Sequence, residues 1–383
     1  MTPAARLSAA ISVLDRVLSG RPAEQALTDW GRQSRFAGSG DRAAVRDLVF
    51  DALRCRRSFA ALGGGSTGRG LILGGLRDAG QEPASLFTGE GHAPAPVTAE
   101  EAGQTPLGNA ALDCPDWLAP ALQTSLGDRF EAVMQAMRHR APVFLRVNAL
   151  RADPASAMRA LADEGIEAHP HPLAKMALEV TGNARKVQAS RAWTEGLVEL
   201  QDVSSQAVVE ALPLGSGMRV LDLCAGGGGK TLAMAARGGL QIWAHDAAPH
   251  RMRDLPARAA RAGVRVTLTE TPEKSAPYEL ILADAPCSGS GSWRRDPQGK
   301  WALTPERLDE LVGIQAGILD RAAPMVATGG RLAYATCSLL EAENEAQASA
   351  FLARTAGWRL ENQLSFTPLQ QGDGFHLSVF QRV

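Results

Sequence analysis

The chain has 383 residues, of which 45% are hydrophobic and 21% are charged. This composition is ordinary for a soluble globular protein and excludes a wholly disordered, collagen-like or disulfide-scaffold chain. The 40 basic and 41 acidic residues give a formal charge of −1, which excludes a uniformly basic nucleic-acid-binding protein. A local basic surface stays compatible with this balance, since residues 1–60 carry ten basic and six acidic side chains. Residues 61–130 carry three basic and eight acidic side chains, so basic and acidic residues are segregated along the chain.

The length, the apolar runs and the cysteines limit which classes of protein this chain can belong to. A chain of this length predicts two to three domains. No apolar run approaches the roughly 18 residues that span a membrane, so we expect no membrane partner. Residues 1–16 predict an amphipathic helix rather than an export signal, which favours the cytoplasm. The odd number of cysteines at long spacings predicts reduced thiols and no metal site: Cys55, Cys114, Cys224, Cys287 and Cys337.

The first part of the chain predicts an all-helical domain over 1–112. Apolar residues recur at the spacing of one helix face: Leu7, Ile11, Leu14 and Leu18. A second helix is predicted over 41–58. Residues 80–110, rich in Gly, Pro, Ala and Thr, indicate a loose connection or a set of short helices.

The next part, 113–200, predicts a small α/β domain. A helix over 115–138 precedes a strand over 143–150, a helix over 152–166 and a short strand over 177–182.

From residue 218 to the end, strands and helices alternate. The predicted strands are 218–224, 241–246, 264–270, 278–286 and 329–338, with a long helix over 304–326. This alternation predicts a third domain over 201–383 with a doubly wound, mostly parallel sheet. Such sheets bind ligands beyond the carboxyl ends of their strands. The notable residues at those ends are Cys224, Asp246, Glu270, Asp284, Cys287 and Cys337.

A glycine loop follows the first of these strands. It consists of Cys224, Ala225, Gly226, Gly227, Gly228, Gly229 and Lys230. Glycines let the backbone approach a ligand closely. The loop matches neither of two familiar nucleotide motifs, because a P-loop requires Gly at Cys224 and a dinucleotide loop requires Gly or Ala at Thr231. Asp246, at the end of the second strand, is placed to accept hydrogen bonds from a ribose.

Two thiols stand at the ends of the fourth and fifth strands. Cys287 and Cys337 each close an apolar run and open a loop, and Cys287 lies near Asp284. Either thiol alone is more simply a small packing residue, because reactivity requires a lowered pKa. The pair at neighbouring ligand-side ends favours catalysis.

The run from DLCAGGGGKT through DAPCSGSGSWRRDPQGKW to ATCSLLEAENEA resembles the Sun/Nop family of RNA 5-methylcytosine methyltransferases, and most nearly its bacterial RsmB-like branch. The likeness covers roughly residues 140–383, and the paired APCSG and ATCS motifs are its most specific part. It implies a Rossmann-like catalytic domain preceded by an RRM-like α/β unit. The helices with DRAAVRDLVFDALR are similar to a NusB-like RNA-binding domain.

The resemblance implies S-adenosyl-L-methionine as cofactor. The loop from Cys224 to Lys230 would line its methionine and ribose part, and Asp246 would hold the ribose hydroxyls. Glu270 would lie beside the adenine, and Asp284 near the methionine amino group and the target base. Two positions depart from the family, which usually has Ala-Pro at Gly226-Gly227 and Asp at Glu270.

The resemblance also implies how the reaction proceeds. Cytosine C5 is a poor nucleophile until a thiolate adds at C6, which is covalent catalysis. By the family pattern Cys337 is the nucleophile, Asp284 shares a proton at N3, and Cys287 assists product release. The base must first leave its stack or be presented single-stranded.

The expected partner is RNA, most simply 16S ribosomal RNA, bound by a monomer. Arg294, Arg295 and Lys300 follow the Cys287 loop and are candidates for phosphate contacts. The arginines between 251 and 265 predict the solvated face of a helix, and Cys55 and Cys114 predict structural thiols.

Three other functions stay open. A transfer RNA is an alternative target. A dinucleotide-dependent oxidoreductase would use a similar sheet, but it has no use for two strand-end thiols. A non-catalytic RNA-binding factor with this fold is compatible with the altered glycine loop.

Overall fold

The computed structural model describes residues 1–383, which form two compact units. The first comprises Met1–Arg140 together with Trp293–Leu303, and the second comprises Ala141–Ser292 together with Thr304–Val383. The predicted boundaries at 112 and 200 stay a prediction. Residues 113–140 nevertheless group with the N-terminal helices, as does a segment that follows the Cys287 loop.

The first unit is helical. Its helices are α1 (Pro3–Leu18), α2 (Ala23–Gln33), α3 (Ser39–Arg54), α4 (Arg56–Gly63), α5 (Gly68–Asp78), α6 (Ala119–Leu126), α7 (Phe130–Met137) and α13 (Pro297–Ala302). Leu7 and Leu14 of α1 pack with Val45 and Val49 of α3 in one hydrophobic core. Between α5 and α6 the chain makes three short 3₁₀ turns, at Pro83–Ser85, Ala99–Glu101 and Gly108–Ala110.

The helix predicted over 41–58 is broken at Cys55, where α3 ends and α4 begins. The reason is a distant carboxylate. Asp113 Oδ1 accepts hydrogen bonds from the backbone N–H groups of Arg57 at 2.8 Å and Ser58 at 2.9 Å. Free N–H groups at the start of a helix need such an acceptor, so Asp113 stabilises a new helix start. Local periodicity gives no sign of a contact 55 residues away.

The second unit begins with an antiparallel four-stranded sheet. Its strands lie in the order β2-β3-β1-β4, with β1 (Val143–Val147), β2 (Glu167–Pro170), β3 (Ala177–Gly182) and β4 (Val198–Leu200). Helices α8 (Pro154–Ala162) and α9 (Arg191–Thr194) belong to this region. Leu145 and Leu178 form its core with Leu161 of α8. This is the small α/β region that the sequence predicts.

The rest of the second unit is built on a seven-stranded sheet with the order β10-β11-β9-β8-β5-β6-β7. Strands β9, β8, β5, β6 and β7 pair in parallel, and β11 pairs antiparallel with β9 and β10. The predicted doubly wound, mostly parallel sheet is confirmed. The strands are β5 (Arg219–Asp222), β6 (Gln241–Ala244), β7 (Thr267–Leu268), β8 (Tyr278–Asp284), β9 (Val326–Thr336), β10 (Trp358–Phe366) and β11 (Phe375–Arg382).

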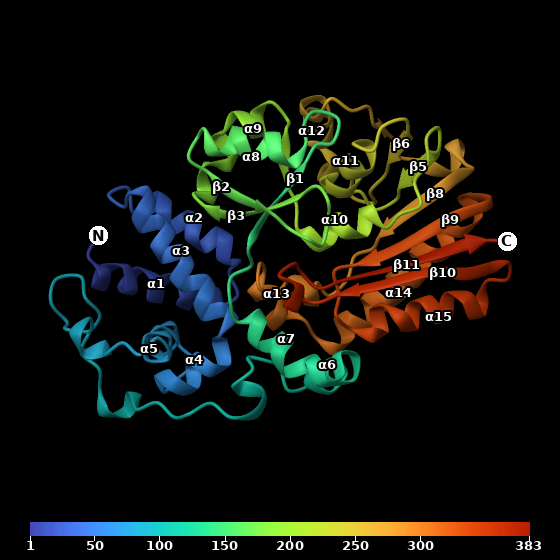
Figure 1. The fold of residues 1–383 in the computed structure, drawn as a ribbon. Coiled ribbons are helices and arrows are strands. Elements are labelled where there is room, and N and C mark those ends of the chain that lie inside the picture. The colour runs from blue at the N-terminus through green and yellow to red at the C-terminus, as the bar shows by residue number, and fades with distance from the viewer. The chain divides into compact units, whose positions relative to one another are not determined.

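Helices cover both faces of this sheet, as Figure 1 shows for the second unit. They are α10 (Val203–Glu210), α11 (Gly229–Ala235), α12 (Leu255–Ala262), α14 (Pro305–Ala322) and α15 (Glu345–Arg354). Leu319 of α14 and Phe351 of α15 pack on Ile281 from one face. Val208 of α10 and Met234 of α11 pack with Leu280 and other strand residues in a separate core. The sheet is therefore buried on both sides, as parallel strands require.

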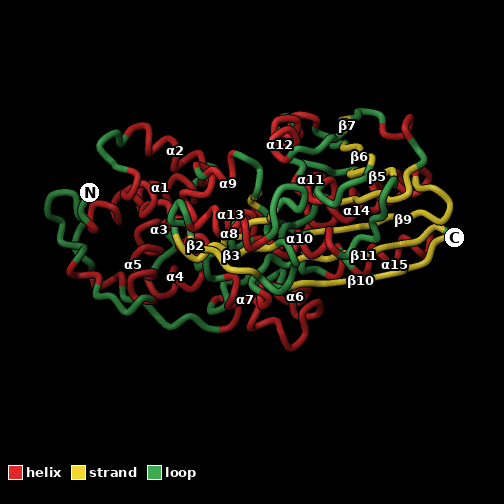
Figure 2. The backbone as a smooth tube through the Cα atoms, turned by 45° about the horizontal axis from the view of Figure 1, so that its top comes forward, coloured by secondary structure: helices red, strands yellow, loops and turns green.

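The C-terminal hairpin is the main element without a sequence prediction. Figure 2 shows β10 and β11 as long strands beside β9, and His376 of β11 pairs in register with Thr336 of β9. The hairpin covers the edge that β9 would otherwise expose. None of the helices is both long and apolar enough to cross a bilayer.

Candidate active site

Strand β5 and its neighbours β6 and β8 form the switch point of the sheet, where ligand sites of this fold class lie. The glycine loop leaves β5 here. Gly228 has φ +82°, and a Cβ at this position would lie 2.3 Å from Cδ1 of Leu255. Gly226 also has a positive φ of +52°. The loop therefore needs glycine at both positions, for backbone conformation and, at Gly228, for space.

Asp246, which follows β6, holds this loop in place. Its carboxylate is 3% exposed and accepts hydrogen bonds from the N–H of Gly226 at 2.8 Å and of Ala248 at 2.9 Å. Arg251 Nη1 lies 3.5 Å from the same carboxylate. Since each oxygen accepts one backbone hydrogen bond, lone pairs remain for a further donor.

Asp284, the last residue of β8, pairs with Lys230 of the glycine loop. Lys230 Nζ lies 2.7 Å from Asp284 Oδ2 and 4.4 Å from the centre of the Phe375 ring. The ammonium is thus held between a carboxylate and an aromatic face. This pair joins the loop after β5 to the end of β8.

Asp222, at the end of β5, is a site residue that the sequence analysis missed. It is 1% exposed and accepts a hydrogen bond of 2.6 Å from the Thr231 hydroxyl. Burial raises the pKa of its carboxyl to about 7, and the charges of Asp284 and Asp246 act in the same direction. An acidic residue inside an otherwise apolar strand could have identified Asp222 from the sequence.

Cys287 and Cys337 are brought together by the pairing of β8 with β9. Asp284 pairs in parallel register with Ala335, so both cysteines follow the same edge of the sheet. Their sulfur atoms lie 3.4 Å apart. The N–H of Gly291 donates to the carbonyl of Cys337 at 2.9 Å, which fixes the two loops against each other.

The two thiols have different surroundings. A hydrogen bond from the Cys287 thiol lowers the pKa of Cys337, and Lys230 and the Ser292 hydroxyl act in the same direction, against burial and Asp284. The same hydrogen bond raises the pKa of Cys287 well above its usual value, and burial and the charges of Cys337 and Glu343 add to this. These directions favour the thiolate at Cys337 over the thiolate at Cys287.

The third thiol in this region is not activated. Burial raises the pKa of Cys224, and the carboxylates of Asp222, Asp284 and Asp246 raise it further. Cys55 and Cys114 are buried in the first unit, where burial raises their pKa values to about 12 and about 11. Burial thus disfavours the thiolate form of all three, and the structural role of Cys55 and Cys114 stays a prediction.

Three arginines also support the loop region, and two of them correct a prediction. Arg258 donates to the carbonyl of Gly227 and lies 3.3 Å from Glu199, and Arg261 lies 2.8 Å from Glu199. The prediction of a solvated arginine face is wrong for these two, because their side chains are only about a fifth exposed and pair with Glu199, which is distant in sequence. Arg146 of β1, 7% exposed, donates to the carbonyl of Gly229 at 2.7 Å. The sequence analysis missed Arg146, although a charged residue inside an otherwise apolar strand could have identified it.

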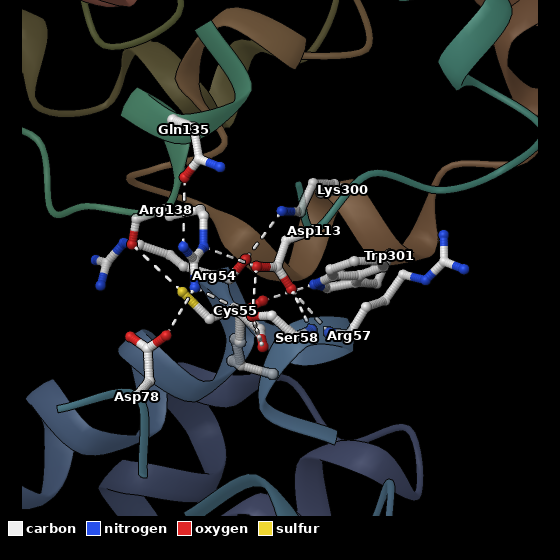
Figure 3. Close-up of polar contacts among 11 residues, drawn as sticks. Arg54, Cys55, Arg57, Ser58, Asp78, Asp113, Gln135, Arg138, Lys300 and Trp301 are labelled. Carbon is white, nitrogen blue, oxygen red and sulfur yellow. Dashed lines mark hydrogen bonds and ion pairs between the residues drawn. The ribbon is translucent and has the colours of Figure 1, made fainter. Parts of the chain in front are cut away.

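The structure places two predicted RNA-binding residues in the interior. Lys300 is 2% exposed, and its Nζ donates to the carbonyl of Arg54 at 3.0 Å. Figure 3 shows its side chain pointing into the polar cluster around Asp113. Burial lowers its pKa to about 8. A side chain held in this way does not reach a phosphate, which corrects the expectation for Lys300.

The remaining predicted residues differ in exposure. Arg294 is 4% exposed, so the same correction applies to it, whereas Arg295 is exposed. Glu270 is exposed after β7. For Arg295 and Glu270 the predicted contacts stay predictions.

Comparisons with known proteins match two regions of the chain to described families. Residues 209–381 match the family described as 16S rRNA methyltransferase RsmB/F. Residues 114–188 match the ferredoxin-like domain described as RsmF/B-like.

Curated relatives are named ribosomal RNA small subunit methyltransferase B. The relative from Citrobacter koseri is 36% identical over 266 residues, which cover 67% of this chain and 61% of the relative. The relative from Xanthomonas campestris is 35% identical over 252 residues, 63% of this chain and 57% of the relative. The matched part of the chain thus spans about three fifths of the length of these relatives.

Solved structures share the fold. The protein PH0851 superposes with a TM-score of 0.77 and 21% identity over 99% of both chains. A methyltransferase homologue from Pyrococcus horikoshii has a TM-score of 0.64 and 24% identity, covering 72% of this chain and 97% of its own. NSun6 from the same organism, solved with SFG, has a TM-score of 0.62 and 18% identity, and the match covers 70% of this chain and 98% of NSun6.

Proposed function

We propose that this chain, which belongs to the RsmB/F family of methyltransferases, transfers a methyl group to C5 of a cytosine in 16S ribosomal RNA. The observation that carries the proposal is the pair of thiols 3.4 Å apart beside the Asp284–Lys230 pair. A thiol nucleophile with a neighbouring proton-bearing thiol suits a reaction that must form and later break a carbon–sulfur bond.

The residues of the glycine loop fit S-adenosylmethionine, which supplies the methyl group as an electrophile. Gly226 and Gly228 keep the loop free of Cβ atoms, and Asp246 has acceptor positions for a ribose diol. Lys230 and Asp284 would lie at the methionine end, and Glu270 would lie at the adenine. The altered Gly226–Gly227 pair is compatible with this role, because the Asp246 carboxylate holds the Gly226 N–H.

In the first step the Cys337 thiolate adds to C6 of cytosine. The new C6–S bond pushes the ring electrons to N3, which takes a proton through Asp284 from the Lys230 ammonium 2.7 Å away. The product is an enamine with a nucleophilic C5. The carbon C5 then takes the methyl group.

In the release step the C5 proton passes to water and the C5–C6 double bond re-forms. The electron pair of the C6–S bond returns to Cys337, and the N3 proton returns through Asp284 to Lys230. The Cys287 thiol, 3.4 Å from Cys337, stabilises the departing thiolate by a hydrogen bond. This gives Cys287 a physical role in product release, since a better-stabilised thiolate leaves faster.

The choice of RNA follows from the relatives, which are named for the small ribosomal subunit. Residues 1–60 carry a surplus of basic side chains, and Arg295 is exposed, which supports phosphate contacts there. A NusB-like RNA-binding role for the helical unit is part of the proposal.

The experiment is in vitro methylation with a labelled methyl donor. Purified chain would be incubated with unmodified 16S RNA, with transfer RNA, and with no RNA, followed by bisulfite mapping. We expect label in 16S RNA at one cytosine. Label in transfer RNA alone would reassign the target, and donor binding without any transfer would favour a non-catalytic RNA-binding factor.

A further inference from the structure

A fully buried carboxylate lies behind the two cysteine loops. Glu343 is 0% exposed and ends a short 3₁₀ turn, six residues after Cys337. Its Oε1 accepts from the N–H of Ser288 at 2.8 Å and from Gln315 Nε2 at 3.0 Å. Its Oε2 accepts from the hydroxyls of Ser288 and Ser338, both at 2.5 Å.

These four donors are all neutral, and they come from three separate segments. Ser288 follows Cys287, Ser338 follows Cys337, and Gln315 lies in α14. Gln315 Nε2 also donates to the carbonyl of Pro286, which precedes Cys287. A buried carboxylate is costly unless it is fully hydrogen-bonded. This one connects both cysteine loops to α14. The Ser290 hydroxyl also joins the two loops, since it lies 3.0 Å from the Ser338 hydroxyl and accepts from the N–H of Leu339 at 2.8 Å.

The charge of Glu343 also acts on the nearer thiol. It raises the pKa of Cys287, after the hydrogen bond with Cys337, burial and the Cys337 charge. The other charged groups facing the pair, Asp284 and Lys230, act on Cys337 with opposite signs. Glu343 therefore contributes, after the hydrogen bond and burial, to the difference between the two thiols.

We propose that Glu343 is a positioning residue that locks the Cys287 loop to the Cys337 loop and keeps the proton on Cys287. The inference rests on the proposed function, because it explains how Cys287 remains a hydrogen-bond donor to the nucleophile and to the leaving thiolate. Glu343 does not touch the base in this scheme and acts through the two cysteines.

The test is the pH dependence of alkylation of Cys287 by iodoacetamide, followed by mass spectrometry in a Cys337→Ser background. Glu343→Gln removes the charge, and we expect the alkylation midpoint of Cys287 to fall by about one pH unit. Glu343→Asp keeps the charge but shortens the reach, so the midpoint should stay high. Glu341→Gln, an exposed carboxyl in the same turn, is the matched control and should not move it.

Methylation by the same variants, made with Cys337 intact, completes the test. We expect Glu343→Gln and Glu343→Asp to lower kcat by about tenfold or more and to slow the decay of the RNA adduct, with KM for the methyl donor unchanged. An unmoved Cys287 midpoint in a folded Glu343→Gln protein would overturn the proposal. Absence of methylation by the unaltered chain would overturn the proposed function instead, since alkylation needs no RNA. If Glu343→Gln does not fold, Ser288→Ala, which removes one donor, must slow adduct decay for the proposal to stand.

Discussion

The sulfur atoms of Cys287 and Cys337 lie 3.4 Å apart although the residues are 50 positions apart in the chain. Strands β8 and β9 run in parallel and end at the same edge of the sheet, so the loops that follow them meet. One hydrogen bond between the thiols lowers the pKa of Cys337 and raises that of Cys287. The chemical difference between two identical side chains thus arises from their surroundings.

The two thiols should respond differently to substitution. Cys337→Ala should reduce methylation by about three orders of magnitude or more and leave no covalent complex, because no nucleophile remains. Cys287→Ala should allow the RNA–protein adduct to accumulate as a slow band on a denaturing gel, since the leaving thiolate loses its hydrogen bond. An adduct that requires Cys287 and survives loss of Cys337 would reverse the assignment.

Asp246→Ala should weaken binding of S-adenosylmethionine. The variant loses both the proposed ribose acceptor and the bond to Gly226, and two such bonds correspond to about 2–3 kcal/mol, or roughly 30–150-fold in Kd. Isothermal titration measures the change. Asp254→Ala, an exposed carboxyl at the start of α12, is the control and should bind normally. If Asp246→Ala and the unaltered chain bind S-adenosylmethionine equally well, Asp246 does not contribute to binding of the cofactor.

Asp222 should make stability depend on pH. Burial raises the pKa of this carboxyl to about 7 in the folded protein, above its usual value of 3.8. The folded state therefore favours the protonated form, and this contribution to stability is present below about pH 4 and is lost as the pH rises to 7. Asp222→Asn should gain stability relative to the unaltered chain over that interval, in urea unfolding at pH 4, 5.5 and 7. If the free energies of unfolding of the two proteins differ by the same amount at all three pH values, the raised pKa of Asp222 is contradicted.

Substitution of Lys300 should affect stability, whereas substitution of Arg295 should affect RNA binding. Lys300→Ala removes a buried hydrogen bond to the Arg54 carbonyl and should lower the free energy of unfolding by about 1–3 kcal/mol. Arg295→Ala removes an exposed charge and should weaken RNA binding and lower its salt dependence. Filter binding at several salt concentrations and thermal unfolding measure the two effects. A Lys300→Ala protein that melts normally but binds RNA poorly would restore the phosphate contact.

The sequence alone predicts the fold class, the five parallel strands of the large sheet and the residues at their carboxyl ends, but not the β10–β11 hairpin. The alternation of apolar runs with helical periods is a local signal, and parallel strands necessarily end at one edge. The glycine loop, Asp246, Asp284 and the two cysteines could be named from this rule and from the resemblance. The resemblance also supplied the assignment of the nucleophile, which neither spacing nor composition contains.

Tertiary structure decided the contacts that join distant segments. Asp113 stabilises the start of α4 after Cys55, Lys300 turns inward to the Arg54 carbonyl, and Glu343 joins the two cysteine loops. An exposed basic residue and a buried one look alike in sequence, because burial depends on which carbonyls the folded chain brings near. The same holds for the thiols, since the hydrogen bond and charges that lower the pKa of Cys337 exist only when β8 and β9 lie side by side.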